Sequence, residues 1–98
     1  MNTIQTTEIF DIWFVALRDR KAKALIQARI DRAEEGNFGD CEPVGKGVSE
    51  MRIHFGAGYR MYFKRFGRNW IILLAGGDKS TQRADIKTAL RLVRDLEG

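Results

Sequence analysis

The stretch VSEMRIHFGAGYRMYFKRF, residues 48–66, decides the fold. Apolar and polar side chains alternate along it, and this period of two is typical of β-strands with one buried face. Gly56 and Gly58 divide the stretch into two strands, and we expect a three-residue turn at residues 56–58 that makes Phe55 face Tyr59. In that register the polar face of the hairpin pairs His54 with Arg60, Arg52 with Tyr62, and Glu50 with Lys64.

A third strand follows this hairpin. Residues 70–75 are apolar on both faces, so we expect this strand in the centre of the sheet. Residues 37–47 contain three glycines, the only proline and no periodicity, which predicts a connecting loop. A short strand through Ile4 has room before the first helix. The predicted sheet is therefore small, curled and antiparallel.

Helical periodicity, with apolar residues three and four positions apart, occurs on both sides of the sheet segment. Trp13 and Trp70 are expected in the core. The predicted helices are residues 9–17 capped by Thr6 or Thr7, residues 22–33 ended by Gly36, and a last helix that starts at Ser80 or Thr81 and buries Ile86, Ala89, Leu90, Val93 and Leu96.

The chain has 98 residues, of which 44% are hydrophobic and 31% are charged. This length and composition predict one globular domain, residues 1–98. The order of the predicted elements places it in the α+β class, with an N-terminal helical hairpin packed on the small curled sheet and a C-terminal helix after it. No apolar run is longer than that of residues 70–75, which is far shorter than the roughly 20 residues of a membrane-spanning helix. With no secretion signal and a single cysteine, we expect a cytoplasmic protein without a membrane partner.

Positive charge is concentrated in the sheet segment. Residues 46–79 carry seven Lys or Arg and two acids, a net charge of +5, whereas the remaining residues carry ten basic and eleven acidic side chains. The formal net charge of the whole chain is +4, so the sheet segment accounts for all of the excess. A basic sheet face indicates a polyanionic partner, and the working hypothesis is RNA.

Three short motifs, in this order and spacing, resemble the RelE/HigB/ParE toxin superfamily. They are Glu-x-Arg-Ile at residues 50–53, Gly-Tyr-Arg at residues 58–60 and Gly-Gly-x-Lys at residues 76–79. Within that superfamily the chain is similar to the branch of addiction-module killer proteins, which is related to phage Gp49-like proteins. The resemblance covers nearly the whole chain and implies a RelE/ParE-like fold.

The resemblance also implies a function. Members of the superfamily are the toxic halves of bacterial type II toxin–antitoxin pairs. RelE- and HigB-like members cleave messenger RNA on the ribosome, and ParE-like members inhibit DNA gyrase without catalysis. The implied partners are messenger RNA and a helix-turn-helix antitoxin, through which alone the toxin reaches operator DNA. Messenger RNA cleavage is the leading hypothesis; gyrase inhibition stays open because, unlike many nucleolytic relatives, this chain has no Tyr or His after residue 70.

RNA cleavage through the 2′-hydroxyl needs a base, cations that stabilise a dianionic phosphorane, and an acid for the leaving 5′-oxygen. No metal or other cofactor is expected, because one His and one Cys are too few ligands for a zinc site. Arg60 matches the strand arginine that RelE-type toxins direct at the scissile phosphate. Arg52 on the same face can hold the flanking phosphate, and Lys79 follows a glycine-rich turn at a helix start, where backbone amides favour anions. His54 is the candidate acid or base.

Four residues are predicted to bind RNA beside these reacting groups. Each also has a structural interpretation, as an ion pair, a packed ring or a solvated side chain. The candidate RNA-binding residues are Arg52, Tyr62, Lys64 and Lys46.

Overall fold

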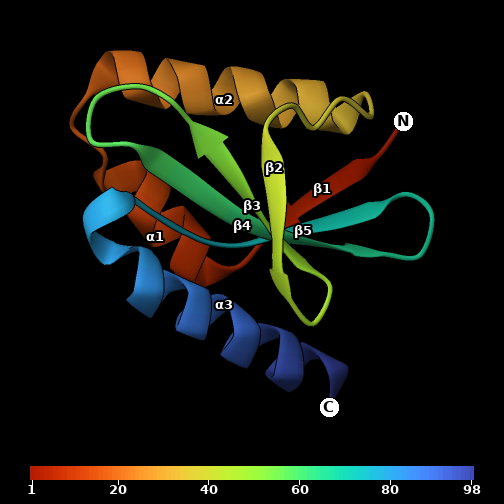
Figure 1. Cartoon of the computed structure of the whole chain (residues 1–98). Coiled ribbons are helices and arrows are strands. Elements are labelled where there is room, and N and C mark those ends of the chain that lie inside the picture. The colour runs from red at the N-terminus through yellow and green to blue at the C-terminus, as the bar shows by residue number, and fades with distance from the viewer.

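The computed structural model describes all 98 residues and has a five-stranded sheet with helices on both faces (Figure 1). The strands are β1 (Thr3–Thr6), β2 (Cys41–Gly45), β3 (Val48–Ile53), β4 (Tyr59–Phe66) and β5 (Trp70–Gly77). The helices are α1 (Glu8–Ala16), α2 (Arg20–Glu34) and α3 (Gln82–Glu97), with a short 3-10 turn, η1 (Lys79–Thr81), before α3. The strand order is β1-β5-β4-β3-β2, and only β1 runs parallel to its neighbour. The α+β class is confirmed.

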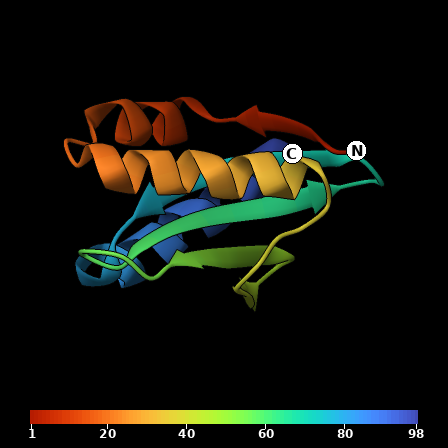
Figure 2. The same ribbon diagram turned by 90° about the horizontal axis from the view of Figure 1, so that it is seen from above.

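The two faces of the sheet bury separate cores. On one face Phe10 of α1 and Ile26 of α2 pack against β3, β4 and β5, so the predicted helical hairpin covers this side. On the other face Ala89 and Val93 of α3 pack against the same strands. Figure 2 shows α2 in front of the strands and α3 behind them. None of these helices has the length and apolar character that crossing a membrane requires.

The helix ends follow the predicted capping residues at two places and differ at a third. The Thr7 hydroxyl oxygen accepts a hydrogen bond from the Phe10 amide, which caps α1. Gly36 adopts a φ of 96° just after α2, and this conformation suits glycine at a helix C-terminus. Thr81 stands at the N-cap position of α3 but forms no side-chain capping bond, and Asp78 instead caps the preceding turn η1, where its carboxylate accepts from the Ser80 amide at 2.8 Å.

The segment predicted as a loop contains a strand. Within residues 37–47, β2 pairs with β3 at the edge of the sheet, where Pro43 faces Ser49. An edge strand tolerates a proline, which cannot donate a backbone hydrogen bond. Most of β2 is exposed, so it lacks the apolar alternation that marks the other strands. Trp70 was also predicted wrongly: it starts β5 with 48% of its surface exposed.

The register of the β3–β4 hairpin differs from the prediction by two residues. Ile53 faces Tyr59 and Arg52 faces Arg60, because the connecting loop holds five residues, 54–58, instead of three. Glu50 accordingly faces Tyr62, not Lys64. A shift by an even number leaves every side chain on its predicted face. Arg52 and Arg60 therefore still share one face of the sheet.

The two glycines that end β5 allow close packing on both sides of the sheet. A Cβ atom at Gly76 would overlap the ring of Trp13 from α1, and one at Gly77 would overlap the carboxylate of Asp85 from α3. A larger residue at either position would have to displace these side chains. The strand can therefore lead directly into η1 and deliver Lys79 beside the β3–β4 loop.

Candidate functional site

The four predicted catalytic residues meet at the end of the sheet where β3 turns into β4. They line one open cavity of about 480 Å³, which we call the sheet-end pocket. The β3–β4 loop supplies most of its lining, and Lys79 joins it from η1, just after the end of β5. The lining residues are Arg52, His54, Phe55, Gly56, Ala57, Gly58, Arg60 and Lys79.

Two neighbouring groups position Arg60 in this pocket, although its buried Nε atom forms no hydrogen bond. Its Nη1 atom donates to the backbone oxygen of Gly58 at 3.0 Å, and its Nε atom lies 3.5 Å from a carboxylate oxygen of Glu50. The side chain is 13% exposed. Its Nη2 atom forms no hydrogen bond within the protein. Arg60 thus combines a fixed position with a donor that remains available for a phosphate oxygen.

Glu50 is the charged residue that fixes Arg60, and it is almost completely buried. The Tyr62 hydroxyl donates to its Oε2 atom at 3.0 Å, and Gln82 Nε2 donates to the same oxygen at 2.9 Å. A buried carboxylate is costly unless donors surround it, and here they do. Burial, together with the Glu50 carboxylate, raises the pKa of the Tyr62 hydroxyl well above its usual value.

Arg52 lies directly opposite Arg60 across the strands, an arrangement that repulsion would disfavour if both were unpaired. Arg52 is paired with two acids from the neighbouring edge: its Nη2 atom lies 3.5 Å from Asp40 and 3.4 Å from Glu42. Its side chain is 27% exposed, and its Nη1 atom forms no hydrogen bond. Neither arginine is sealed from solvent.

His54 pairs with Asp40 at the mouth of the pocket, through a contact of 2.5 Å from Nε2 to Oδ2. The hydrogen bond with His54 is the main reason that the pKa of Asp40 is lowered. Because an ionised carboxylate only accepts, Nε2 carries the proton, and Nδ1 of the neutral ring is left as a proton acceptor. Asp40 lies just before β2, within the segment that was predicted to be a loop. No sequence pattern predicts its contact with His54.

Lys79 differs from the two arginines because no acid pairs with it. Its backbone amide donates to the Ala57 oxygen at 3.3 Å, which ties η1 to the β3–β4 loop. The prediction that backbone amides near Lys79 favour an anion has a protein competitor in the turn η1. Asp78 already occupies those amides, and its hydrogen bonds with Ser80 lower the pKa of the Asp78 carboxyl.

The other predicted RNA-binding residues lie outside the pocket. Tyr62 is fully buried, so its ring is not available to stack on a base, and that prediction is corrected. Lys64 lies at the far end of β4, where its Nζ atom donates to the backbone oxygen of Lys46 at 3.2 Å. Lys46 is exposed in the β2–β3 turn. Arg52 alone of this group reaches the pocket.

Two acids from outside residues 46–79 lower the positive charge that the sequence predicts for the sheet face. Asp40 and Glu42 lie outside residues 46–79 in the sequence but beside Arg52 in the fold. The sheet face is therefore less basic than its own segment suggests. No three His, Cys, Asp or Glu side chains gather to form a metal site. Cys41 is partly buried, which raises the pKa of its thiol and makes it a poor nucleophile.

Comparison with known proteins identifies the family of this chain. Residues 13–94 match the family of phage-derived Gp49-like proteins (DUF891). An uncharacterised protein of Haemophilus influenzae (strain ATCC 51907 / DSM 11121 / KW20 / Rd) is 50% identical over 93 residues, which are 95% of this chain and 94% of that protein. No solved structure matches the chain significantly. Because the family match covers most of the chain, the chain belongs to the phage-derived Gp49-like family.

Proposed function

We propose that this protein is the toxin of a bacterial type II toxin–antitoxin system and that it stops translation by cutting messenger RNA on the ribosome. The Gp49-like family is phage-derived and often related to toxin–antitoxin systems, which supports the first half of the proposal. The sheet-end pocket supports the second half, since it gathers three cations and one imidazole around a single open cavity. That convergence is the observation on which the proposal depends.

In the proposed reaction the neutral His54 takes the proton of a ribose 2′-hydroxyl at Nδ1, with Asp40 orienting the ring. The 2′-oxygen then forms a bond to the adjacent phosphorus, and the bond from phosphorus to the 5′-oxygen breaks. The products are a 2′,3′-cyclic phosphate and a 5′-hydroxyl. No metal enters this scheme.

The cations have separate parts in this scheme. Arg60 Nη2 and Arg52 Nη1, which form no hydrogen bond within the protein, bind the non-bridging phosphate oxygens as negative charge develops. Lys79, unpaired and exposed, donates to the leaving 5′-oxygen. Because Gly58 and Glu50 already contact the other two nitrogens of Arg60, its guanidinium needs little reorganisation to bind a phosphate oxygen. This is the physical advantage of the buried Glu50.

The proposed partners are messenger RNA and a helix-turn-helix antitoxin that neutralises the toxin. Operator DNA would be reached only through that antitoxin. The proposed reaction takes place in the cytoplasm, where ribosomes are.

The test is to add purified protein to translating ribosomes and map the new RNA 5′ ends. Wild-type protein should give defined cuts, and Arg60→Ala should slow cutting by about 10²- to 10³-fold, the usual effect of removing one charge-stabilising donor. Arg32→Ala, which changes an exposed arginine on α2, is the matched control and should cut normally. Intact messages with the wild-type protein would refute the proposal.

Gyrase inhibition remains the second candidate because of one feature of the helical hairpin. The outer side of α1 exposes Ile9, Ile12 and Val15, of which Val15 is 73% exposed. An apolar stripe of this kind suits contact with another protein. A DNA supercoiling assay with purified gyrase decides: inhibition by both wild type and Arg60→Ala would support this candidate over RNA cleavage.

A further inference from the structure

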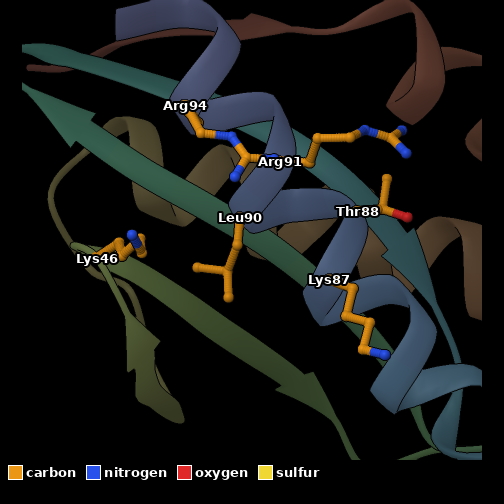
Figure 3. Close-up of a pocket in the computed structure, with 6 residues that line it drawn as sticks. All are labelled: Lys46, Lys87, Thr88, Leu90, Arg91 and Arg94. Carbon is orange, nitrogen blue, oxygen red and sulfur yellow. The ribbon is translucent and has the colours of Figure 1, made fainter.

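A second hollow lies along α3, away from the sheet-end pocket. It has a volume of about 440 Å³ and runs between the helix and the β2–β3 turn. In Figure 3 Lys46 approaches Leu90 from that turn, while the basic side chains extend from successive turns of α3. We call it the α3 groove; its lining residues are Lys46, Lys87, Thr88, Leu90, Arg91 and Arg94.

The cations of the α3 groove have no partners within the protein. None of the four basic side chains forms an ion pair or a hydrogen bond, and no carboxylate lines the groove. Glu97, near the C-terminal end of α3, contacts Lys64 at 3.7 Å instead. Lys87 and Arg91 are four residues apart, so like charges adjoin on one helix face and weaken the helix. Stability of the fold gives no reason for this arrangement.

The composition of the groove indicates the class of ligand. A protein partner would need apolar or aromatic anchors at the centre of the contact, and Leu90 is the only hydrophobic residue in the lining. Lys87 and Arg94 are seven residues apart, which is about 10 Å along a helix. A row of cations of that length, open to water, suits the regularly spaced charges of a sugar–phosphate backbone.

We propose that the α3 groove binds the phosphate backbone of RNA, at a site separate from the sheet-end pocket. The groove holds RNA through charge alone, without reading its bases, and so anchors a strand whose other nucleotides occupy the pocket. This inference rests on the proposed function for the identity of the polyanion. The proposed site includes Lys46, which was predicted to bind RNA from the sequence. It also includes three residues that were not predicted: Lys87, Arg91 and Arg94.

The experiment measures binding apart from cleavage. A fluorescent single-stranded RNA of about 30 nucleotides is titrated with full-length protein at several KCl concentrations. The test variant carries Lys87→Gln and Arg91→Gln, and the matched control carries Arg20→Gln and Arg32→Gln, with the same charge change on α2. Losing two phosphate contacts should lower the slope of log K against log salt by about 1.4 and weaken binding at least about tenfold at low salt. The control should stay within about twofold of the wild type.

The fold of each variant is checked by thermal unfolding. Replacing Lys87 and Arg91 removes repulsion on α3, so this variant should melt no lower than the wild type. Lys46→Asn is an independent second test, because Lys46 has a φ of 52°, a conformation that asparagine tolerates well. It should lower the salt slope by about 0.7.

Each outcome bears on one proposal. Unchanged RNA affinity in both groove variants overturns this inference, even if Arg60→Ala abolishes cutting. Weakened binding in the groove variants supports it, even if the wild type leaves messages intact and the proposed function fails. Poly-glutamate of matching length should compete poorly with the RNA; equal competition would mean that the groove accepts any acidic polymer, a protein segment included, and would overturn the assignment to RNA.

Discussion

The sheet-end pocket and the α3 groove are both basic, but they hold their arginines in opposite ways. In the pocket, Arg60 is paired with Glu50, and Arg52 with Asp40 and Glu42. In the groove, no acid contacts any of the cations. Carboxylates reduce the local positive charge of the pocket while they fix each guanidinium in place. The groove keeps its full charge but leaves its side chains free to move.

Paired cations are suited to positioning a phosphate group, and unpaired cations are suited to attracting one. A reacting phosphate needs donors held at defined positions, and pairing with protein acids provides that at the expense of charge. A backbone that is only retained needs charge and tolerates mobile side chains. The two surfaces therefore suit the two different tasks that we propose for them.

The largest expected effect is on stability. Glu50→Ala leaves Tyr62, Gln82 and Arg60 without their common acceptor inside the protein, and should lower the free energy of unfolding by about 3–5 kcal/mol. Lys87→Ala, on the exposed side of the groove, should change it by no more than about 0.5 kcal/mol. Urea unfolding measures both. Equal effects would show that the buried network does not set the pocket apart.

The next effect is on the chemistry of the cations. Arg60→Lys keeps the charge but loses the planar fork that reaches Gly58 and a phosphate together, so RNA cutting should fall at least about tenfold. Arg91→Lys keeps all that the groove requires, and RNA affinity should stay within about twofold. Comparing cutting rates and affinities for the two exchanges sharpens the contrast. Similar tolerance at both sites would remove it.

The smallest effect concerns pH. The pKa of Asp40 is lower in the folded protein than in the unfolded chain, so ionised Asp40 stabilises the fold above about pH 3.9, and this contribution disappears as the pH falls through the lowered pKa. In Asp40→Asn this stabilising contribution is absent at every pH. The stability difference between the two proteins should therefore narrow between about pH 5 and pH 2 in urea unfolding. Asp40 is 44% exposed, so the change should be small; a difference independent of pH would mean that Asp40 does not hold His54 by its charge.

The sequence alone determined the central strands, the three helices and which side chains share a face. These depend on periodicity among residues a few positions apart, and that signal survived even where the hairpin register was wrong by two. For this reason the sequence placed Arg52 and Arg60 on one face of the sheet, while Lys79 was predicted from the glycine-rich turn that precedes it. It also gave the capping residue of α1 and the glycine that ends α2.

The tertiary structure decided which charges are paired. Gln82 meets Glu50 across 32 residues of sequence, and Asp40 meets His54 across 14. No local pattern records such contacts, because they arise only when β2 joins the sheet edge and α3 covers its second face. The same packing buried Tyr62 and left Lys87, Arg91 and Arg94 unpaired beside Lys46. Local periodicity fixed where the cations point, and long-range packing fixed which of them an acid neutralises.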